Sequence, residues 1–69
     1  MNAQPATTCY QVNLQRWFGG GEVYTGFLTH ALHELGWGTV IFVHAKAEFW
    51  EKLVPPNTVL VRVASFAEI

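Results

Sequence analysis

Aspartate is absent from this sequence, and charged residues make up only 13% of its 69 positions. An average domain is about a quarter charged. The formal net charge is −1 and no cluster of Lys or Arg occurs, which excludes binding to nucleic acid through neutralised phosphates. A Ser-His-Asp triad is also excluded, and only a version with glutamate in place of aspartate can be built.

Cysteine occurs once, at Cys9, so no disulfide can form within the chain. We interpret it as a small buried hydrophobic residue rather than a nucleophile. His30 and His33 are spaced to share a metal ion, but no third ligand stands out, since His44 lies on another element. Catalytic zinc sites use three protein ligands. We therefore predict neither a metal site nor a cofactor.

Long apolar runs are also missing, and nothing approaches the roughly 20 residues needed to cross a bilayer. The first residues lead through the polar stretch 2–5, without a basic region or an apolar one, so no signal peptide is recognised. The expected location is the cytoplasm, and peripheral contact with the inner face of the membrane stays open.

A short chain with few charges needs help to stay folded. A chain of this length buries only about 60% of the surface that it exposes when unfolded. Small domains usually rely on disulfides, a metal or a partner surface, and the last fits this composition best. Residues 66–69 begin a new segment that stops on an isoleucine. We therefore expect residues 1–69 to be a partial N-terminal domain, completed by more of the same chain or by a second subunit.

The first half of the chain has the pattern of a strand followed by a helix. Residues 8–14 alternate between apolar and mostly polar side chains, which predicts a strand with one apolar face. Its polar side carries Gln11 and Asn13, so either that face is only partly covered or the amides serve a site at the strand's end. Residues 22–35 are predicted to form a helix that ends at Gly36. Its predicted inward face consists of Val23, Tyr24, Phe27, Leu28, Ala31, Leu32 and Leu35, and its outer face of Thr25, Thr29, His30 and His33.

The second half repeats this alternation. Residues 39–44 contain a β-branched apolar run, as expected of a strand buried on both faces. Residues 46–53 predict a short helix, stopped by two prolines, and residues 58–63 a third strand. The short helix turns Phe49, Trp50 and Leu53 inward, and Lys46, Glu48, Glu51 and Lys52 outward. This order predicts an α/β fold, a Rossmann-like βαβαβ unit with a three-stranded parallel sheet. Strand orders 2-1-3 and 3-2-1 both remain open.

The most informative feature is a glycine triplet at 19–21, between the first strand and the first helix. In open α/β sheets ligands bind at the carboxyl ends of the strands, where a helix N-terminus presents free N–H groups. The triplet therefore favours a phosphate or sugar site over a turn that only lets strand and helix pack. A P-loop is rejected because Phe27 and Leu28 stand where Lys and Ser/Thr are required, and the dinucleotide fingerprint because Tyr24 stands at its third glycine.

Two features keep more than one interpretation open. Gly26 lies inside the predicted helix, where glycine costs about 1 kcal/mol relative to alanine. This glycine either allows a neighbouring element to come close or is tolerated without a role in packing. Trp17 and Phe18 flank the glycine triplet and either stack on a sugar or anchor the loop.

The stretch NLQRWFGGGEVYT at 13–25, followed by HALHELGW at 30–37, resembles the start of glycosyltransferases with the GT-B fold, of the family 4 type. Those proteins open with a strand, a glycine loop and a helix that ends in a Leu-x-x-x-Gly pattern, supplied here by residues 32–36. The resemblance covers residues 8–63 and implies the first part of a GT-B N-terminal domain. It implies a two-domain enzyme that transfers a sugar from a nucleotide-sugar donor to a glycan, lipid or small-molecule acceptor.

The resemblance also implies which residues bind. The glycine loop would lie near the donor diphosphate and the residues after it would line the cleft: Gly19, Gly20, Gly21, Glu22, Tyr24 and Thr25. The C-terminal domain that holds the nucleotide is absent from these 69 residues, so this chain alone is expected to be inactive. No residue has a clear claim to be the catalytic base.

Two other functions remain open at this stage. The chain can belong to a different Rossmann-like protein that binds a nucleotide or phosphate, such as a relative of the sugar-nucleotide epimerases. It can also be a small interaction module that oligomerises through its apolar surface.

Overall fold

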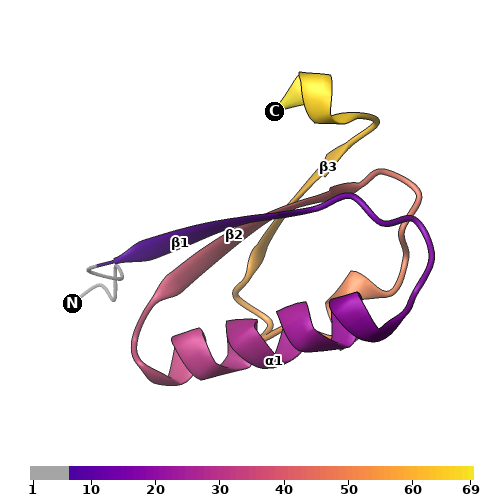
Figure 1. The fold of residues 1–69 in the computed structure, drawn as a ribbon. Helices are drawn as coiled ribbons and strands as arrows, with labels where there is room; N and C mark the ends of the chain where they lie inside the picture. The colour runs from indigo at the N-terminus through magenta and orange to yellow at the C-terminus, as the bar shows by residue number, and fades with distance from the viewer. Residues whose placement is uncertain (1–6) are drawn as a thin grey trace.

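The computed structural model describes residues 7–69, and the polar stretch 2–5 lies outside them. In chain order the elements are strand β1 (Thr8–Asn13), helix α1 (Gly20–Glu34), strand β2 (Gly38–His44), the 3-10 turn η1 (Trp50–Lys52), strand β3 (Val59–Val63) and the 3-10 turn η2 (Phe66–Glu68) (Figure 1). The predicted α/β class is confirmed. None of the described residues forms a helix with the length and apolarity of a membrane span.

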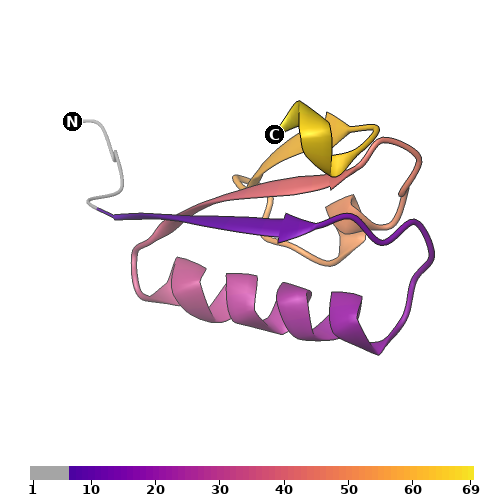
Figure 2. The same ribbon diagram turned by 45° about the horizontal axis from the view of Figure 1, so that its top comes forward.

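The three strands form one parallel sheet in the order β1-β2-β3. Tyr10 of β1 lies opposite Val40 of β2, which in turn lies opposite Val59 of β3. Read from the β3 side, this is the order 3-2-1, one of the two orders that the sequence left open. Both crossovers step in the same direction, so right-handed connections place them on one side of the sheet. Figures 1 and 2 show α1 and η1 together on that side.

The main hydrophobic core lies between β2 and the segment that follows it. Ile41, Val43, Ala47 and Trp50 are fully buried, and Val54 completes the cluster. Partly buried side chains pack around it, namely Phe49, Leu53 and Leu60. Burial of one large apolar side chain contributes roughly 1.5–3 kcal/mol. This cluster, called the β2 core below, therefore supplies much of the stability, and the inward position predicted for Trp50 is confirmed.

The helix predicted for residues 46–53 is wrong, because only the short turn η1 forms there. The chain turns directly after β2: the amide of Lys46 donates to Nδ1 of His44, and the amide of Ala47 to the carbonyl of His44, both at 3.0 Å. Pro55 and the proline after it then disfavour helical backbone in the residues before them. Between the turn after His44 and Pro55 the chain therefore forms only the single 3-10 turn η1.

Helix α1 ends where the sequence predicts. Gly36 has a φ of 85°, in the left-handed region that favours glycine. The amides of Gly36 and Trp37 donate to the carbonyls of His33 and Leu32, each at 3.0 Å. This pair of bonds is a Schellman motif, which satisfies the last carbonyls of the helix and turns the chain into β2.

The face that α1 turns toward the sheet differs from the prediction. Its buried residues are Glu22, Gly26 and Thr29. Five of the residues predicted to point inward are instead exposed, namely Tyr24, Phe27, Leu28, Ala31 and Leu35. We call these five the outer helix stripe. A Cβ added to Gly26 would lie 2.9 Å from the carbonyl oxygen of Leu53, so only glycine permits this close contact. Gly26 therefore serves packing, and it is one reason why this face points inward.

Polar pairing with β1 is the second reason. The hydroxyl of Thr29 accepts a hydrogen bond from Nε2 of Gln11 at 2.9 Å, and that of Thr25 accepts one from Nδ2 of Asn13 at 3.3 Å. Each hydroxyl also donates to a carbonyl one turn earlier in the helix. Buried polar groups need such partners. The amides of β1 therefore favour the helix face that carries hydroxyls, and they serve the contact with the helix.

The other side of the sheet is apolar, and the described residues place no α-helix over it. Two cross-strand rows make up this open sheet face, Tyr10-Val40-Val59 and Val12-Phe42-Val61. Tyr10 is 67% exposed and Val59 is 53% exposed, while Val40 and Phe42 are half-buried. The prediction that β2 is buried on both faces is therefore wrong for the described part of the chain.

Candidate functional site

The carboxyl ends of the three parallel strands lie at one edge of the sheet. Two connections leave this edge next to each other, the loop of residues 14–19 after β1 and the segment of residues 45–49 after β2 (Figure 2). Ligands of open α/β proteins bind at this edge. The search for a site therefore begins with the side chains and free amides of these two connections.

The glycine triplet forms the start of α1. Gly19 is the N-cap residue, with extended backbone and no side-chain cap, and Gly20 and Gly21 form the first helical positions. A Cβ on Gly20 or Gly21 would meet nothing within 4 Å. The first amides of a helix have no partner within the helix and carry a partial positive charge. These two glycines therefore leave the amino end of α1 open to approach.

Glu22 occupies part of this amino end. Its side chain is only 4% exposed, and its Oε1 lies 3.4 Å from the position that a Cβ would take on Gly19. A carboxylate in the first turn suits the helix dipole. It also means that a diphosphate at the amides of Gly20 and Gly21 would meet a buried negative charge.

The two remaining residues implied by the resemblance point in different directions. The hydroxyl of Thr25 is engaged with Asn13 and with the carbonyl of Gly21, on the side facing β1. Tyr24 is 68% exposed and belongs to the outer helix stripe. The structure thus brings Gly19 to Glu22 together, ties Thr25 to Gly21 on the side facing β1, and turns Tyr24 away from them.

A cavity of about 530 Å³ lies beside the glycine triplet, between the two connections. Its lining consists of Arg16, Trp17, Phe18, Lys46, Glu48, Phe49 and Lys52. Pockets for small molecules commonly measure roughly 300–1,000 Å³ and combine apolar walls with a few polar groups. Size and lining both meet that description, and we call this space the edge cavity.

Aromatic stacking fixes the inner wall of the edge cavity. The rings of Phe18 and Phe49 meet edge to face at 5.5 Å, and Phe49 packs on Trp50 of the β2 core at 5.2 Å. Phe18 is therefore the anchor of the loop. Trp17 is 73% exposed, with the guanidinium of Arg16 4.8 Å from the centre of its ring. Phe18 is also 56% exposed, but its ring packs on Phe49, so Trp17 offers the larger free surface to a ligand.

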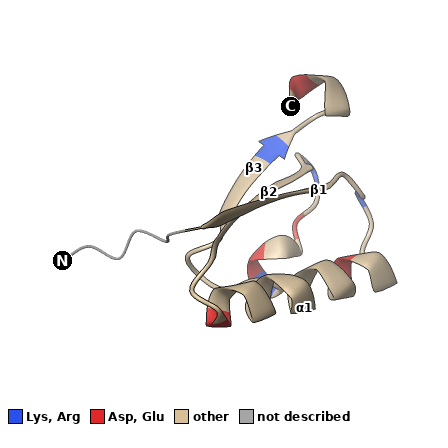
Figure 3. Ribbon diagram, turned by 60° about the vertical axis from the view of Figure 1, so that its left-hand side comes forward, with Lys and Arg blue, Asp and Glu red and all other residues tan. Residues whose placement is uncertain are grey.

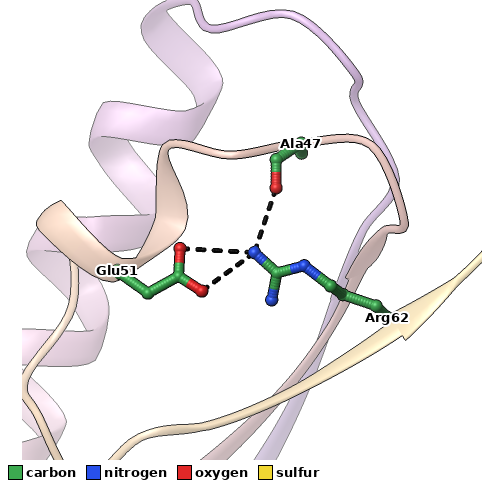
Figure 4. Close-up of polar contacts among 3 residues, drawn as sticks. All are labelled: Ala47, Glu51 and Arg62. Carbon is green, nitrogen blue, oxygen red and sulfur yellow. Dashed lines mark hydrogen bonds and ion pairs between the residues drawn. The ribbon is translucent and has the colours of Figure 1, made fainter.

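Positive charge gathers in the edge cavity. Three of the four Lys and Arg residues line it, together with one of the five glutamates. The remaining cation, Arg62, donates to Glu51 at 2.9 Å and to the carbonyl of Ala47 at 3.1 Å (Figure 4). Figure 3 shows how little of the ribbon carries charge at all. The cavity is therefore the cationic part of a chain whose formal net charge is −1.

Sequence reasoning missed four of the seven lining residues. The predicted helix at 46–53 assigned Lys46, Glu48 and Lys52 to a solvated face, and Phe49 to the core. A signal was present, because Arg16 and Lys46 each follow the end of a strand within three residues. Parallel strands bring such positions to one edge of the sheet.

Metal-ligand geometry does not occur among residues 7–69, where no three His, Cys, Asp or Glu side chains are close enough to hold an ion. His30 and His33 are exposed on α1. His44 accepts a hydrogen bond from the amide of Lys46 through its Nδ1. These three side chains are therefore placed separately.

Comparison with known proteins gives no relative: no family model, no curated protein and no solved structure matches this chain. The fold is therefore described by its own topology, a parallel three-stranded α/β unit compatible with a Rossmann-like arrangement. What the site does must be argued from its residues.

Proposed function

We propose that this chain is the acceptor-side segment of a glycosyltransferase that moves a sugar from a nucleotide-sugar donor to an acceptor. One observation carries the proposal: the edge cavity and the open amino end of α1 lie side by side at the carboxyl edge of a parallel sheet. A transferase needs room there for two ligands, and these neighbouring features offer a place for each.

The donor diphosphate is assigned to the amino end of α1. The amides of Gly20 and Gly21, at the first helical positions, have no acceptor within the helix and are suited to an anion. The carboxylate of Glu22 must turn away from Gly19 for a diphosphate to reach them. The acceptor is assigned to the edge cavity, where Trp17 offers a flat apolar surface of the kind on which sugar rings stack. The proposed location is the cytoplasm.

The nucleotide half of the donor has no place in this proposal among the described residues. A second α/β domain of the same polypeptide would hold it, as in the family that the sequence resembles. No residue of the chain is assigned as the catalytic base. Activity is therefore a property of the complete enzyme, and the described residues contribute positioning.

The test has two steps. The encoding reading frame is followed beyond codon 69, and the full-length polypeptide is then incubated with a panel of nucleotide sugars and with NAD(H). The proposal expects a second α/β domain and a change in thermal stability with at least one nucleotide sugar. Binding of NAD(H) without any nucleotide sugar would instead establish the alternative of another nucleotide-binding Rossmann-like protein.

A second candidate rests on the exposed apolar surface. The outer helix stripe and the open sheet face together expose large side chains, with Phe27 and Leu35 each 71% exposed. Apolar patches of this kind mark interaction surfaces. As a small interaction module, the chain would form a discrete oligomer in sedimentation experiments and would bind no nucleotide sugar. A monomer that binds a nucleotide sugar would reject this candidate.

A further inference from the structure

The edge cavity has a charge pattern that restricts its ligand. Three cationic side chains face it, against the single carboxylate of Glu48. Residues 7–69 contain one ion pair, between Arg62 and Glu51, and both partners lie outside the lining. Arg16, Lys46 and Lys52 are therefore not neutralised by ion pairs among the described residues.

The three cations come from two connections that the parallel sheet brings together, so their meeting is a product of the fold. Arg16 lies on the loop after β1, whereas Lys46 and Lys52 lie on the connection between β2 and β3. Two of them have a contact that restricts their position. The guanidinium of Arg16 stacks over Trp17 at 4.8 Å, and the amide of Lys46 is fixed by Nδ1 of His44 at 3.0 Å. A stacked guanidinium keeps its N–H edges free for a planar or tetrahedral anion.

The inner wall supports these groups with a rigid contact to the protein interior. Phe18 packs on Phe49, and Phe49 packs on the fully buried Trp50. A ligand in the cavity would therefore touch a wall that is continuous with the β2 core. Among the described residues no carboxylate pairs with these cations, so an anion that enters the cavity would supply their counter-charge.

We propose that the edge cavity binds the phosphate group of a phosphorylated sugar, with the sugar ring against Trp17. Arg16, Lys46 and Lys52 contact the phosphate, and Glu48 weakens its binding. Calling this sugar phosphate the acceptor rests on the proposed transferase function, whereas the binding itself does not. The site is separate from the amino end of α1, since none of the three glycines lines the cavity.

The experiment compares three probes on the full-length protein by calorimetry: a hexose 6-phosphate, inorganic phosphate and the free hexose. The hexose phosphate is expected to bind most tightly, because it alone uses both the cations and Trp17. Inorganic phosphate is expected to bind about tenfold more weakly, and the free hexose more weakly still. Raising the salt concentration is expected to weaken binding of the hexose phosphate and to leave binding of the free hexose unchanged.

Four variants locate the site. Lys46→Gln with Lys52→Gln is expected to lower hexose phosphate affinity by about tenfold or more, because each lost contact was charge-assisted. Trp17→Ala lowers the affinity for the hexose phosphate and leaves the affinity for inorganic phosphate unchanged. Glu48→Gln raises the affinity for the hexose phosphate, since a neighbouring negative charge is removed. Arg62→Gln removes one positive charge outside the cavity and serves as the matched control. It is expected to leave the affinity for the hexose phosphate unchanged.

The outcomes separate this inference from the proposed function. Unchanged affinity in the double lysine variant, or equal loss in the Arg62→Gln control, would overturn the cavity as the phosphate site. If a nucleotide sugar binds while the hexose phosphate does not, the transferase proposal stands and this inference fails. If the hexose phosphate binds at the cavity and no nucleotide sugar binds, the inference stands and the transferase proposal fails.

Discussion

Two regions on the covered side of the sheet are held together by different forces. The β2 core is held together by apolar packing, with Ile41, Val43 and Trp50 fully buried, and the buried Nε1 of Trp50 has no hydrogen-bond partner among the described residues. The contact between β1 and α1 instead rests on hydrogen bonds, including the one from Gln11 to Thr29, while the close approach of Gly26 to Leu53 joins α1 to the segment after η1. Apolar burial adds up over area, whereas a hydrogen bond contributes only about 1 kcal/mol net and depends on geometry. The helix is therefore positioned by specific contacts more than by burial.

This difference bears on the candidate site, because the site joins the two regions. The amino end of α1 belongs to the polar contact, and the inner wall of the edge cavity belongs to the β2 core through Phe49 and Trp50. Substitutions that weaken one region and spare the other test whether the comparison is correct.

The largest effect is expected for Trp50→Ala, which removes the largest fully buried side chain. Such truncations cost about 3–5 kcal/mol, comparable to the whole stability of a small domain. Urea unfolding followed by circular dichroism measures the change. Trp17→Ala is the control, since Trp17 is 73% exposed and its loss should change stability by less than about 0.5 kcal/mol. Similar losses in both variants would contradict the placement of the core.

Gly26→Ala is expected to destabilise the protein by about 1–3 kcal/mol, because its Cβ would meet the backbone oxygen of Leu53 at 2.9 Å. Helix propensity alone predicts the opposite, a gain of up to about 1 kcal/mol. Gly21→Ala is the matched control in the same helix, with open space around the new Cβ, and it should be neutral or slightly stabilising. Thermal unfolding of the two variants settles the sign, and a stabilising Gly26→Ala would place α1 farther from Leu53.

Thr29→Val is expected to cost about 1–2 kcal/mol, because it leaves the amide of Gln11 without its partner. Combined with Gln11→Leu, the loss should largely disappear, since both polar partners are then gone. A double-mutant cycle in urea measures this coupling. Simple additivity of the two single changes would show that the β1–α1 contact does not depend on this bond.

The smallest effect is expected for Glu51→Gln, which breaks the ion pair with Arg62. The two side chains are 60% and 33% exposed, so solvent screens the pair, and the change should stay within about 0.5 kcal/mol. Unfolding at low and high salt measures it. A loss that is both large and independent of salt would contradict the solvent-screened character of this pair.

Local signals in the sequence predicted the class of fold and most of the elements. The alternation of β1, the apolar run of β2 and the glycine stop at Gly36 each act over a few residues, so they can be recognised without a structure. The rotation of α1 could not be predicted in this way. It depends on Leu53, which is distant in sequence, and on amides of β1 that outweigh the apolar stripe.

The candidate site was predictable to a similar degree. The position of the glycine triplet at the start of α1 follows from local pattern, and the structure places it there. Its role with a donor diphosphate stays a prediction. Lys46 and Lys52 are exposed, as predicted, but the edge cavity that they line together with the loop after β1 was missed because the segment after β2 was assigned to a helix. One hydrogen bond to His44 changes that path.

The strand order β1-β2-β3 also has a consequence for how the chain assembles. Pairing β1 with β2 joins Thr8 to Gly38, 30 residues apart, whereas pairing β2 with β3 joins Val40 to Val59, 19 residues apart. Closing the longer loop costs about 0.4 kcal/mol more in chain entropy, and the shorter one also gathers the β2 core. We therefore expect the β2–β3 pair to form the folding nucleus, so that β1, although synthesised before both, is fixed after them.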